Sequence, residues 1–148
     1  MKALVMTSCT VFNPTGLLTP VWRDLIAELL APEFTDAVAR ATGSALQRGT
    51  VEIRACGYAD GCYLGPHTDR ADKLVSVILY LEPEWSPPEG GWLSILRSSD
   101  PGDEVGRVEP LLGSAAILVR SERSWHQVLP VRRPRSGYRR SVLMHYWA

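Results

Sequence analysis

The sequence predicts a mainly β protein, a sandwich or barrel, with one or two helices packed outside it. From Thr50 onward the chain consists of short β-rich runs separated by Gly and Pro. Helical spacing of apolar residues is confined to about residues 19–43. Many short strands divided by turn residues are typical of sandwiches and barrels. We therefore expect a β core over about residues 50–148 with a helical support before it.

The helical part is expected to begin at Thr19-Pro20. Thr can cap a helix, and Pro at the first helical position loses no hydrogen bond. An apolar stripe follows at helical spacing, formed by Val21, Trp22, Leu25, Ile26, Leu29 and Leu30. Pro32 is expected to end this helix, and a second short helix is expected to run from a cap at Thr35 to Gly43. Residues 1–18 show no clear period and are expected to form an extended lead-in.

Several runs in the second part of the chain are predicted to be strands. They are rich in β-branched and aromatic residues and are bounded by Gly, Pro or polar residues. They cover residues 51–58, 74–81, 92–96, 115–119, 126–131 and 138–147. The Pro- and Gly-rich stretch 82–91 and the polar stretch 98–106 are expected to be loops. Because no repeat or linker divides the chain, residues 1–148 are expected to form a single domain.

Charge and cysteine content narrow the range of partners and compartments. The chain has 16 basic and 16 acidic residues. Since proteins that bind nucleic acids or membrane surfaces usually carry a basic excess, neither partner is expected. Cys9, Cys56 and Cys62 have no CxxC spacing, which favours reduced thiols and a cytoplasmic location. No apolar run approaches the roughly 18 residues of a membrane helix, and no signal peptide is expected.

The residues that carry chemistry begin in the stretch from Tyr63 to Asp69. Alternate side chains of a strand point to the same side, so His67 and Asp69 can supply two ligands of one metal ion. A third ligand has to come from His126 or His145, and His126 lies in an apolar, strand-like run. Two His and one carboxylate form the facial triad that holds non-haem Fe(II) and leaves positions open for substrate and oxygen.

A set of short motifs follows in order along about two-thirds of the chain. They are Tyr58-x-x-Gly61-x-Tyr63-Leu64-x-x-His67-x-Asp69, Leu79-Tyr80-Leu81, Gly90-Gly91-x-Leu93, Gly113, His126-x-Val128-x-Pro130-Val131 and Gly137-x-Arg139-x-Ser141. In this order they resemble the Fe(II)/2-oxoglutarate-dependent dioxygenases of the prolyl-4-hydroxylase-like branch. The resemblance implies a double-stranded β-helix, a jelly-roll or cupin-like barrel of two sheets with iron at its mouth.

The resemblance also implies roles for single residues. The iron ligands of the family are matched by His67, Asp69 and His126. Arg139 matches the residue that pairs with the distal carboxylate of 2-oxoglutarate, and Ser141 matches a supporting hydroxyl two residues later. Tyr80 matches a tyrosine that hydrogen-bonds the cosubstrate in some relatives, and Tyr58 matches an aromatic residue that lines the same pocket.

The role of Arg139 as a carboxylate partner also has a physical basis that does not depend on the resemblance. The distal carboxylate of a keto acid would be buried in an apolar barrel, where an unpaired charge is costly. Arg supplies a planar, always-charged fork that can pair with it through two hydrogen bonds. Arg139 and Arg140 face opposite ways on a strand, and Arg139 shares its parity with Ser141, Leu143 and His145. His145 is expected to line the pocket or to be a hydrogen-bonded core residue rather than a ligand.

The function implied by the resemblance is hydroxylation of an unactivated C–H bond, with release of succinate and CO2. The implied cofactors are Fe(II), 2-oxoglutarate and O2, with ascorbate as a candidate reductant. Asp69 favours hydroxylation over halogenation, because related halogenases have a small residue there. Desaturation and ring closure need the same ligands and stay open.

The compact chain favours a small amino-acid-like metabolite, or a residue presented on a peptide or carrier, as the substrate. Residues 1–18, 82–91 and 98–106 are candidate substrate contacts, and Trp125 could border the substrate beside its neighbour His126. Two rivals stay open. One is a metal hydrolase or a dioxygenase that needs no cosubstrate, and the other is a non-catalytic, cupin-like module that binds a metal or small ligand.

Overall fold

The computed structural model describes residues 19–46, 50–132 and 137–148. The lead-in expected for residues 1–18, with Cys9 in it, lies outside the described residues. The described elements are α1 Pro20–Leu30, α2 Pro32–Thr42, β1 Thr50–Tyr58, β2 Leu64–His67, β3 Lys73–Tyr80, the 3-10 helix Pro87–Glu89, β4 Leu93–Leu96, β5 Glu104–Val108, β6 Ala115–Val119, β7 His126–Val128 and β8 Arg139–Trp147. Among these described residues, no helix is long and apolar enough to cross a membrane.

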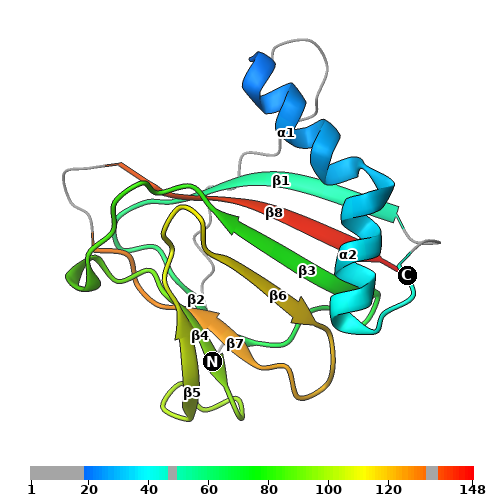
Figure 1. Ribbon diagram of the computed structural model, residues 1–148. Coiled ribbons are helices and arrows are strands. Elements are labelled where there is room, and N and C mark those ends of the chain that lie inside the picture. Colours follow the sequence, from blue (N-terminus) through cyan, green and yellow to red (C-terminus); the bar gives the residue numbers. More distant parts are fainter. Residues whose placement is uncertain (1–18, 47–49, 133–136) are drawn as a thin grey trace.

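The strands form two four-stranded sheets in which all pairings between strands are antiparallel. The first sheet has the order β1-β8-β3-β6, and the second has the order β2-β7-β4-β5. The C-terminal strand β8 therefore lies between β1 and β3. Both helices lie on one side of the first sheet (Figure 1). The prediction of a mainly β protein with helices packed outside is confirmed.

The helical region differs from the prediction at one point. Thr19 is the N-cap position of α1 and Pro20 its first residue, as predicted. Pro32 does end α1, but it also begins α2, with Ala31 at the N-cap. The predicted start at a Thr35 cap is therefore wrong, because Pro is well suited to the first helical turn. The Thr35 hydroxyl instead lies 3.3 Å from the Tyr146 hydroxyl.

The strand predictions fail at three places. β2 was not among the predicted strands, although His67 was expected at a strand end. β5 lies partly within the stretch 98–106 that was expected to be a loop, and it pairs with β4. The predicted strand 126–131 ends at Val128, and Val131 then forms an isolated bridge with Gly90. The stretch 82–91 is a loop as expected, apart from the short 3-10 helix within it.

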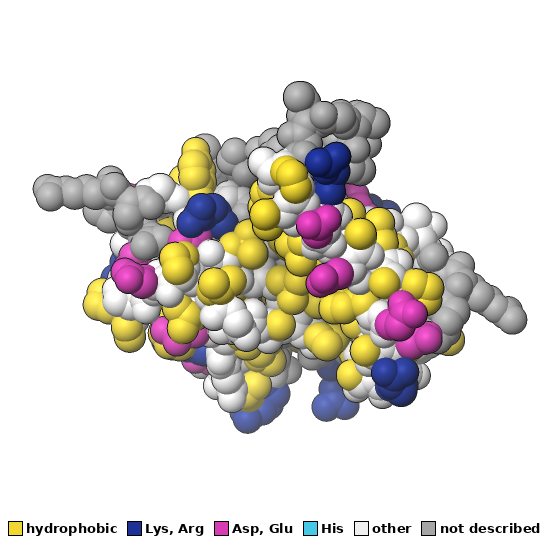
Figure 2. All heavy atoms as spheres, turned by 45° about the horizontal axis from the view of Figure 1, so that its top comes forward, with side chains coloured by type: hydrophobic (Ala, Val, Ile, Leu, Met, Phe, Trp, Pro, Cys, Tyr) yellow, Lys and Arg dark blue, Asp and Glu magenta, His cyan; other side chains and the backbone are white. Residues whose placement is uncertain are grey.

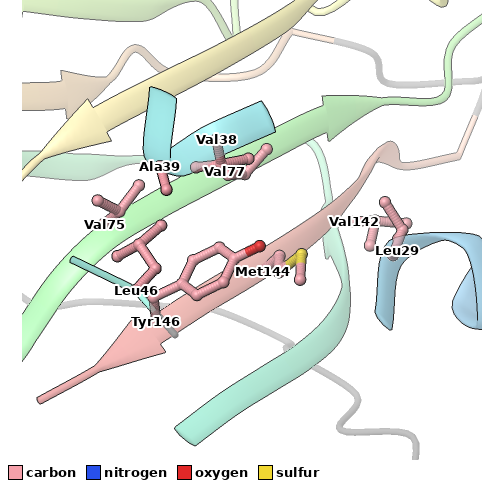
Figure 3. Packing of buried hydrophobic residues seen from close by; sticks show 9 residues of the cluster. All are labelled: Leu29, Val38, Ala39, Leu46, Val75, Val77, Val142, Met144 and Tyr146. Atoms are coloured by element: carbon pink, nitrogen blue, oxygen red, sulfur yellow. The ribbon is translucent and has the colours of Figure 1, made fainter. Parts of the chain in front are cut away.

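The main hydrophobic core lies between the helices and the outer face of the first sheet. Its buried members come from both helices, from the segment after α2, from β3 and from β8 (Figure 3). They are Leu29, Val38, Ala39, Leu46, Val75, Val77, Val142, Met144 and Tyr146. Burying a side chain of this size contributes about 1.5–3 kcal/mol, so this layer supplies much of the stability of the fold.

The helical face of the molecule is separate from the histidines. Figure 2 shows this face, on which hydrophobic side chains are spread widely, with acidic and basic side chains among them. None of His67, His126 and His145, all of which the structure describes, is visible there. The helices thus support the sheet from one side and leave its other face to the site described next.

Candidate active site

A cavity of about 150 Å³ is lined by residues from both sheets. The first sheet contributes β8 residues of one parity, namely Arg139, Ser141, Leu143 and His145, together with Tyr58, Ser76, Ile78 and Leu118. The second sheet contributes Leu64, His67, Leu93, His126 and Val128. Because strand neighbours alternate between faces, β8 sends one set of side chains into this cavity and the other set into the helical core.

Three ligand-type side chains meet at this cavity. One nitrogen of His67, one nitrogen of His126 and one carboxylate oxygen of Asp69 all lie within 4.8 Å of one another. The two imidazole rings are 4.2 Å apart between centroids. His67 ends β2 and His126 begins β7, and these two residues are register partners. The antiparallel pairing of β2 with β7 therefore brings together two histidines that are far apart in the sequence.

The outer nitrogens of both histidines are held by the backbone. His67 Nδ1 lies 2.9 Å from the carbonyl oxygen of Gly65, and His126 Nδ1 lies 3.0 Å from that of Ser124. A carbonyl can only accept, so Nδ1 carries the proton and Nε2 keeps its lone pair for a metal. Burial, together with the neighbouring His67, lowers the pKa of His126 and favours the neutral ring that binds metals.

Asp69 is held from two sides. Lys73 Nζ donates to Oδ1 at 2.9 Å, and Ser76 Oγ donates to Oδ2 at 2.8 Å. The Lys73 and Asp69 side chains are only 12% and 11% exposed. Burial alone would raise the pKa of Asp69, but the hydrogen bond and charge of Lys73 and the hydrogen bond from Ser76 lower it below its usual value. The carboxylate is therefore ionised and oriented before any metal arrives.

Arg139 lies in the same cavity and is 2% exposed. Its guanidinium carbon is 5.1 Å from the ring centroid of Tyr58 and 5.0 Å from that of Tyr80. No salt bridge joins it to any acidic residue that the structure describes. Burial lowers the pKa of Arg139, and the two tyrosines oppose this effect. An arginine stays charged even so, and a buried cation without a carboxylate partner is costly.

Three buried polar atoms around this arginine have no hydrogen-bond partner within the described part of the chain. They are Arg139 Nε, Tyr80 Oη and Ser141 Oγ. Ser141 is the register partner of Tyr80 on the neighbouring strand β3. Buried groups of this kind are rarely left unpaired, so they indicate a place for an acceptor such as a carboxylate.

Gly90 and Gly91 support Arg139 from the loop before β4. Both have positive φ angles, 63° and 65°, which side chains other than glycine rarely adopt. A Cβ on Gly91 would lie 3.2 Å from Arg139 Cδ and 3.0 Å from a methyl group of Val131. The Trp85 indole donates to the Gly90 carbonyl oxygen at 2.9 Å, which fixes the loop in this position.

The structure brings together most of the residues that the sequence singled out. The side chains of Tyr58, His67, Asp69, His126, Arg139 and Ser141 all line one cavity. Tyr80 contacts the guanidinium but is not among the described residues that line the cavity, and neither are Trp125 or the loops 82–91 and 98–106. His145 lines the cavity and lies near Ser76, as expected for a pocket residue.

Two residues that contact Asp69 were not predicted from the sequence, namely Lys73 and Ser76. A signal for Ser76 was present, because it is the one small hydroxyl residue within the apolar run of residues 74–81. A buried hydroxyl needs a partner, and Asp69 is that partner. Lys73 gave no comparable signal, since a lysine at the start of a strand is usually solvated.

A family model described as the 2OG-Fe(II) oxygenase superfamily matches residues 53–147, which include every site residue described above. The chain belongs to the 2OG-Fe(II) oxygenase superfamily. No curated protein matches the sequence. The membership confirms the predicted class of enzyme, an Fe(II)/2-oxoglutarate-dependent oxygenase, and its predicted cofactors, Fe(II) and 2-oxoglutarate.

Several solved structures share the fold of this superfamily member. A Pseudomonas putida prolyl-4-hydroxylase is 24% identical, with a TM-score of 0.71 over 94% of this chain and 70% of that one. A Trichoplax adhaerens prolyl hydroxylase in complex with a hypoxia inducible factor peptide is 18% identical, with a TM-score of 0.58 over 78% of this chain and 53% of that one. EvdO2 from Micromonospora carbonacea var. aurantiaca, in complex with 2-oxoglutarate, is 18% identical, with a TM-score of 0.57 over 85% of this chain and 64% of that one. The fold is therefore a double-stranded β-helix, as the resemblance implied.

The residues of this oxygenase fit both cofactors chemically. Two imidazoles with free Nε2 lone pairs and one ionised carboxylate are a donor set suited to Fe(II), with coordination positions left over. The buried guanidinium, which has no acidic partner among the described residues, and the hydroxyls of Tyr80 and Ser141 suit the distal carboxylate of 2-oxoglutarate. The metal-binding and anion-binding groups line or adjoin one cavity, so a ligand could contact both sets of groups at once.

Proposed function

We propose that this chain hydroxylates an unactivated C–H bond, using Fe(II) held by His67, Asp69 and His126. One observation carries the proposal. The triad occurs together with a buried cation, Arg139, that has no acidic partner among the described residues. A cupin-like protein that only holds a metal would have no use for a buried guanidinium without an acidic partner.

The chain's own residues would bind, orient and exclude water. Arg139 would pair with the distal carboxylate of 2-oxoglutarate through its planar fork, and Ser141 and Tyr80 would donate their unpaired hydroxyls. Tyr58 would cover the guanidinium with its ring and keep water from it. When bound, Fe(II) and 2-oxoglutarate supply the oxidising chemistry, in which 2-oxoglutarate and O2 are converted to succinate and CO2 as the C–H bond is hydroxylated.

The proposed substrate is an amino-acid-like group, either a small metabolite or a residue on a peptide or carrier. Two similar structures are prolyl hydroxylases, and one of them was solved with a peptide fragment. Identities of 24% and 18% carry the fold and leave the substrate to the loops. The carboxylate of Asp69 supports hydroxylation over halogenation, because as a ligand it would occupy a position that a halide would need.

Succinate release in the presence of Fe(II), 2-oxoglutarate and O2 tests the proposal, with a panel of free amino acids and short peptides as substrates. The expected result is substrate-stimulated succinate with a hydroxylated product of 16 Da higher mass. Before the screen, anaerobic addition of Fe(II) and 2-oxoglutarate should give a weak visible charge-transfer band. Arg139→Met should lose this band at moderate 2-oxoglutarate concentration, and the matched variant Arg140→Gln should keep it. A chain that binds iron but neither shows the band nor releases succinate would contradict the proposal and favour one of the rivals.

A further inference from the structure

A polar chain of three residues leads from β8 to the proposed iron ligand Asp69. His145 and Ser76 are register partners on the adjacent strands β8 and β3. Ser76 Oγ lies 3.1 Å from His145 Nδ1 and 2.8 Å from Asp69 Oδ2. Ser76 and His145 are 3% and 7% exposed, so water has little access to these hydrogen-bonded side chains.

The direction of both hydrogen bonds follows from counting protons. A serine hydroxyl has one proton, and an ionised carboxylate can only accept. Asp69 is ionised because Lys73 Nζ lies 2.9 Å from its other oxygen. The Ser76 proton therefore points to Asp69 Oδ2, and Ser76 Oγ has to accept from His145 Nδ1. His145 is thereby fixed as the tautomer with its proton on Nδ1.

We propose that His145 is a positioning residue, which holds the Ser76 hydroxyl on Asp69 and thereby fixes the orientation of the carboxylate that would bind iron. This inference rests on the proposed role of Asp69 as a ligand. Without the His145 donor, the Ser76 hydroxyl could rotate away, and the Asp69 carboxylate would be oriented by Lys73 alone. Partners of metal ligands commonly change metal affinity about 10- to 100-fold when they are removed, although they never touch the metal.

The first test uses the metal-free, full-length protein and needs no substitution. Long-range ¹H–¹⁵N NMR of the three histidines at neutral pH reports the tautomer of each ring. The expected result for His145 is a neutral ring with the proton on Nδ1, assigned by loss of its signals in His145→Asn. A proton on Nε2 would overturn the proposal. Because no metal is present, this result is independent of whether the proposed function is right.

The second test is a double-mutant cycle on the Kd for Mn(II), a redox-inert probe of the triad, measured by calorimetry. Ser76→Ala and His145→Leu should each weaken binding about tenfold, and the double variant should be no more than threefold weaker than Ser76→Ala. His145→Asn keeps a donor near the position of Nδ1 and should stay within threefold of the wild type.

Three outcomes would overturn the inference: His145→Leu within twofold of the wild type, fully additive losses in the double variant, or His145→Asn as weak as His145→Leu. Additive losses would mean that His145 acts by packing and not through Ser76. Failure of the wild-type protein to bind Mn(II) at all would instead contradict the proposed function, and the tautomer measurement would still decide the hydrogen-bond direction. The two failures are thus distinguishable.

Discussion

Replacing Arg139 with Met should have opposite effects on cosubstrate binding and on the stability of the ligand-free protein. Met is similar in length to the arginine stem and carries no charge or hydrogen-bond donor. Removing one partner of a buried charge pair costs about 2–5 kcal/mol, which corresponds to roughly a 30-fold to a few thousandfold increase in the Kd for 2-oxoglutarate. The triad does not contact this end of the cavity in any described hydrogen bond, so the Kd for Mn(II) should change less than threefold.

The same substitution should not destabilise the ligand-free fold. In the absence of ligand the guanidinium is 2% exposed and has no acidic partner among the described residues, which costs several kcal/mol. The rings of Tyr58 and Tyr80 offset part of this cost, by roughly 1–2 kcal/mol each. The net expectation is a free energy of unfolding that is unchanged or up to about 2 kcal/mol higher in Arg139→Met.

Calorimetry with Mn(II) and 2-oxoglutarate measures the first effect, and urea unfolding of the metal-free protein measures the second. Arg140→Gln is the matched control, because its side chain is on the opposite face of β8 and pairs with Glu82. The control should keep the wild-type Kd for 2-oxoglutarate. An Arg139→Met variant that is clearly less stable and still binds 2-oxoglutarate with the wild-type Kd would refute the assignment, because it would show that the guanidinium is a structural group.

Three further predictions concern the support of the site. Gly91→Ala should lower the free energy of unfolding by about 2 kcal/mol and weaken 2-oxoglutarate binding, because it combines a φ of 65° with contacts of 3.0–3.2 Å; Gly106→Ala, which meets nothing within 4 Å, should do neither. Burial, helped by the charge of Lys73, lowers the pKa of His145 to about 4. From about pH 6.5 down to 4 the unfolded state therefore binds a proton that the folded state does not. The metal-free protein should lose up to about 3 kcal/mol of stability over this range. Urea titrations at several pH values should show a smaller loss in His145→Asn. Glu82→Gln should lower the free energy of unfolding by about 1–3 kcal/mol in the same assay. The buried carboxylate accepts hydrogen bonds from the backbone N–H of Arg140 at 2.8 Å and from the guanidinium of Arg140 at 2.9 Å. An unchanged urea midpoint would contradict this prediction.

The elements that the sequence predicted well are those with a strong apolar pattern. β3 is a nearly continuous apolar run, β8 is mostly apolar from Val142 onward, and α1 carries a clear apolar stripe. β5 was missed because it lies at the edge of its sheet, its middle residues face solvent, and Gly106 lowers its strand propensity. The start of α2 was misplaced because Pro32 can either end a helix or begin one, and the sequence does not distinguish the two uses.

The site was predictable where its geometry is local. The two-residue spacing of His67 and Asp69 suggested two ligands at one strand end. β2 ends at His67 and Asp69 follows in the loop, but both line the same cavity. The parity of β8 separates Arg139 from its neighbour. The contacts of Asp69 with Lys73 and Ser76 were not predictable, because they depend on where β3 begins and how it lies against the loop after β2. A strand pattern fixes the face of a side chain but not which loop will pack on it.

The alternation along β8 explains how this fold tolerates an unpaired buried cation. On its outer face Val142, Met144 and Tyr146 enter the helical core, and their burial contributes roughly 5–9 kcal/mol as an upper bound. This burial helps to offset the cost of the guanidinium that the same strand buries on its inner face, and it favours the register that keeps Arg139 inside. A shift of one residue would move the three apolar side chains into the cavity and Arg139 toward the helical core at the same time. Pairing with β1 on one side and β3 on the other resists that shift, so the core residues and the proposed cosubstrate residues are held in place by the same two ladders.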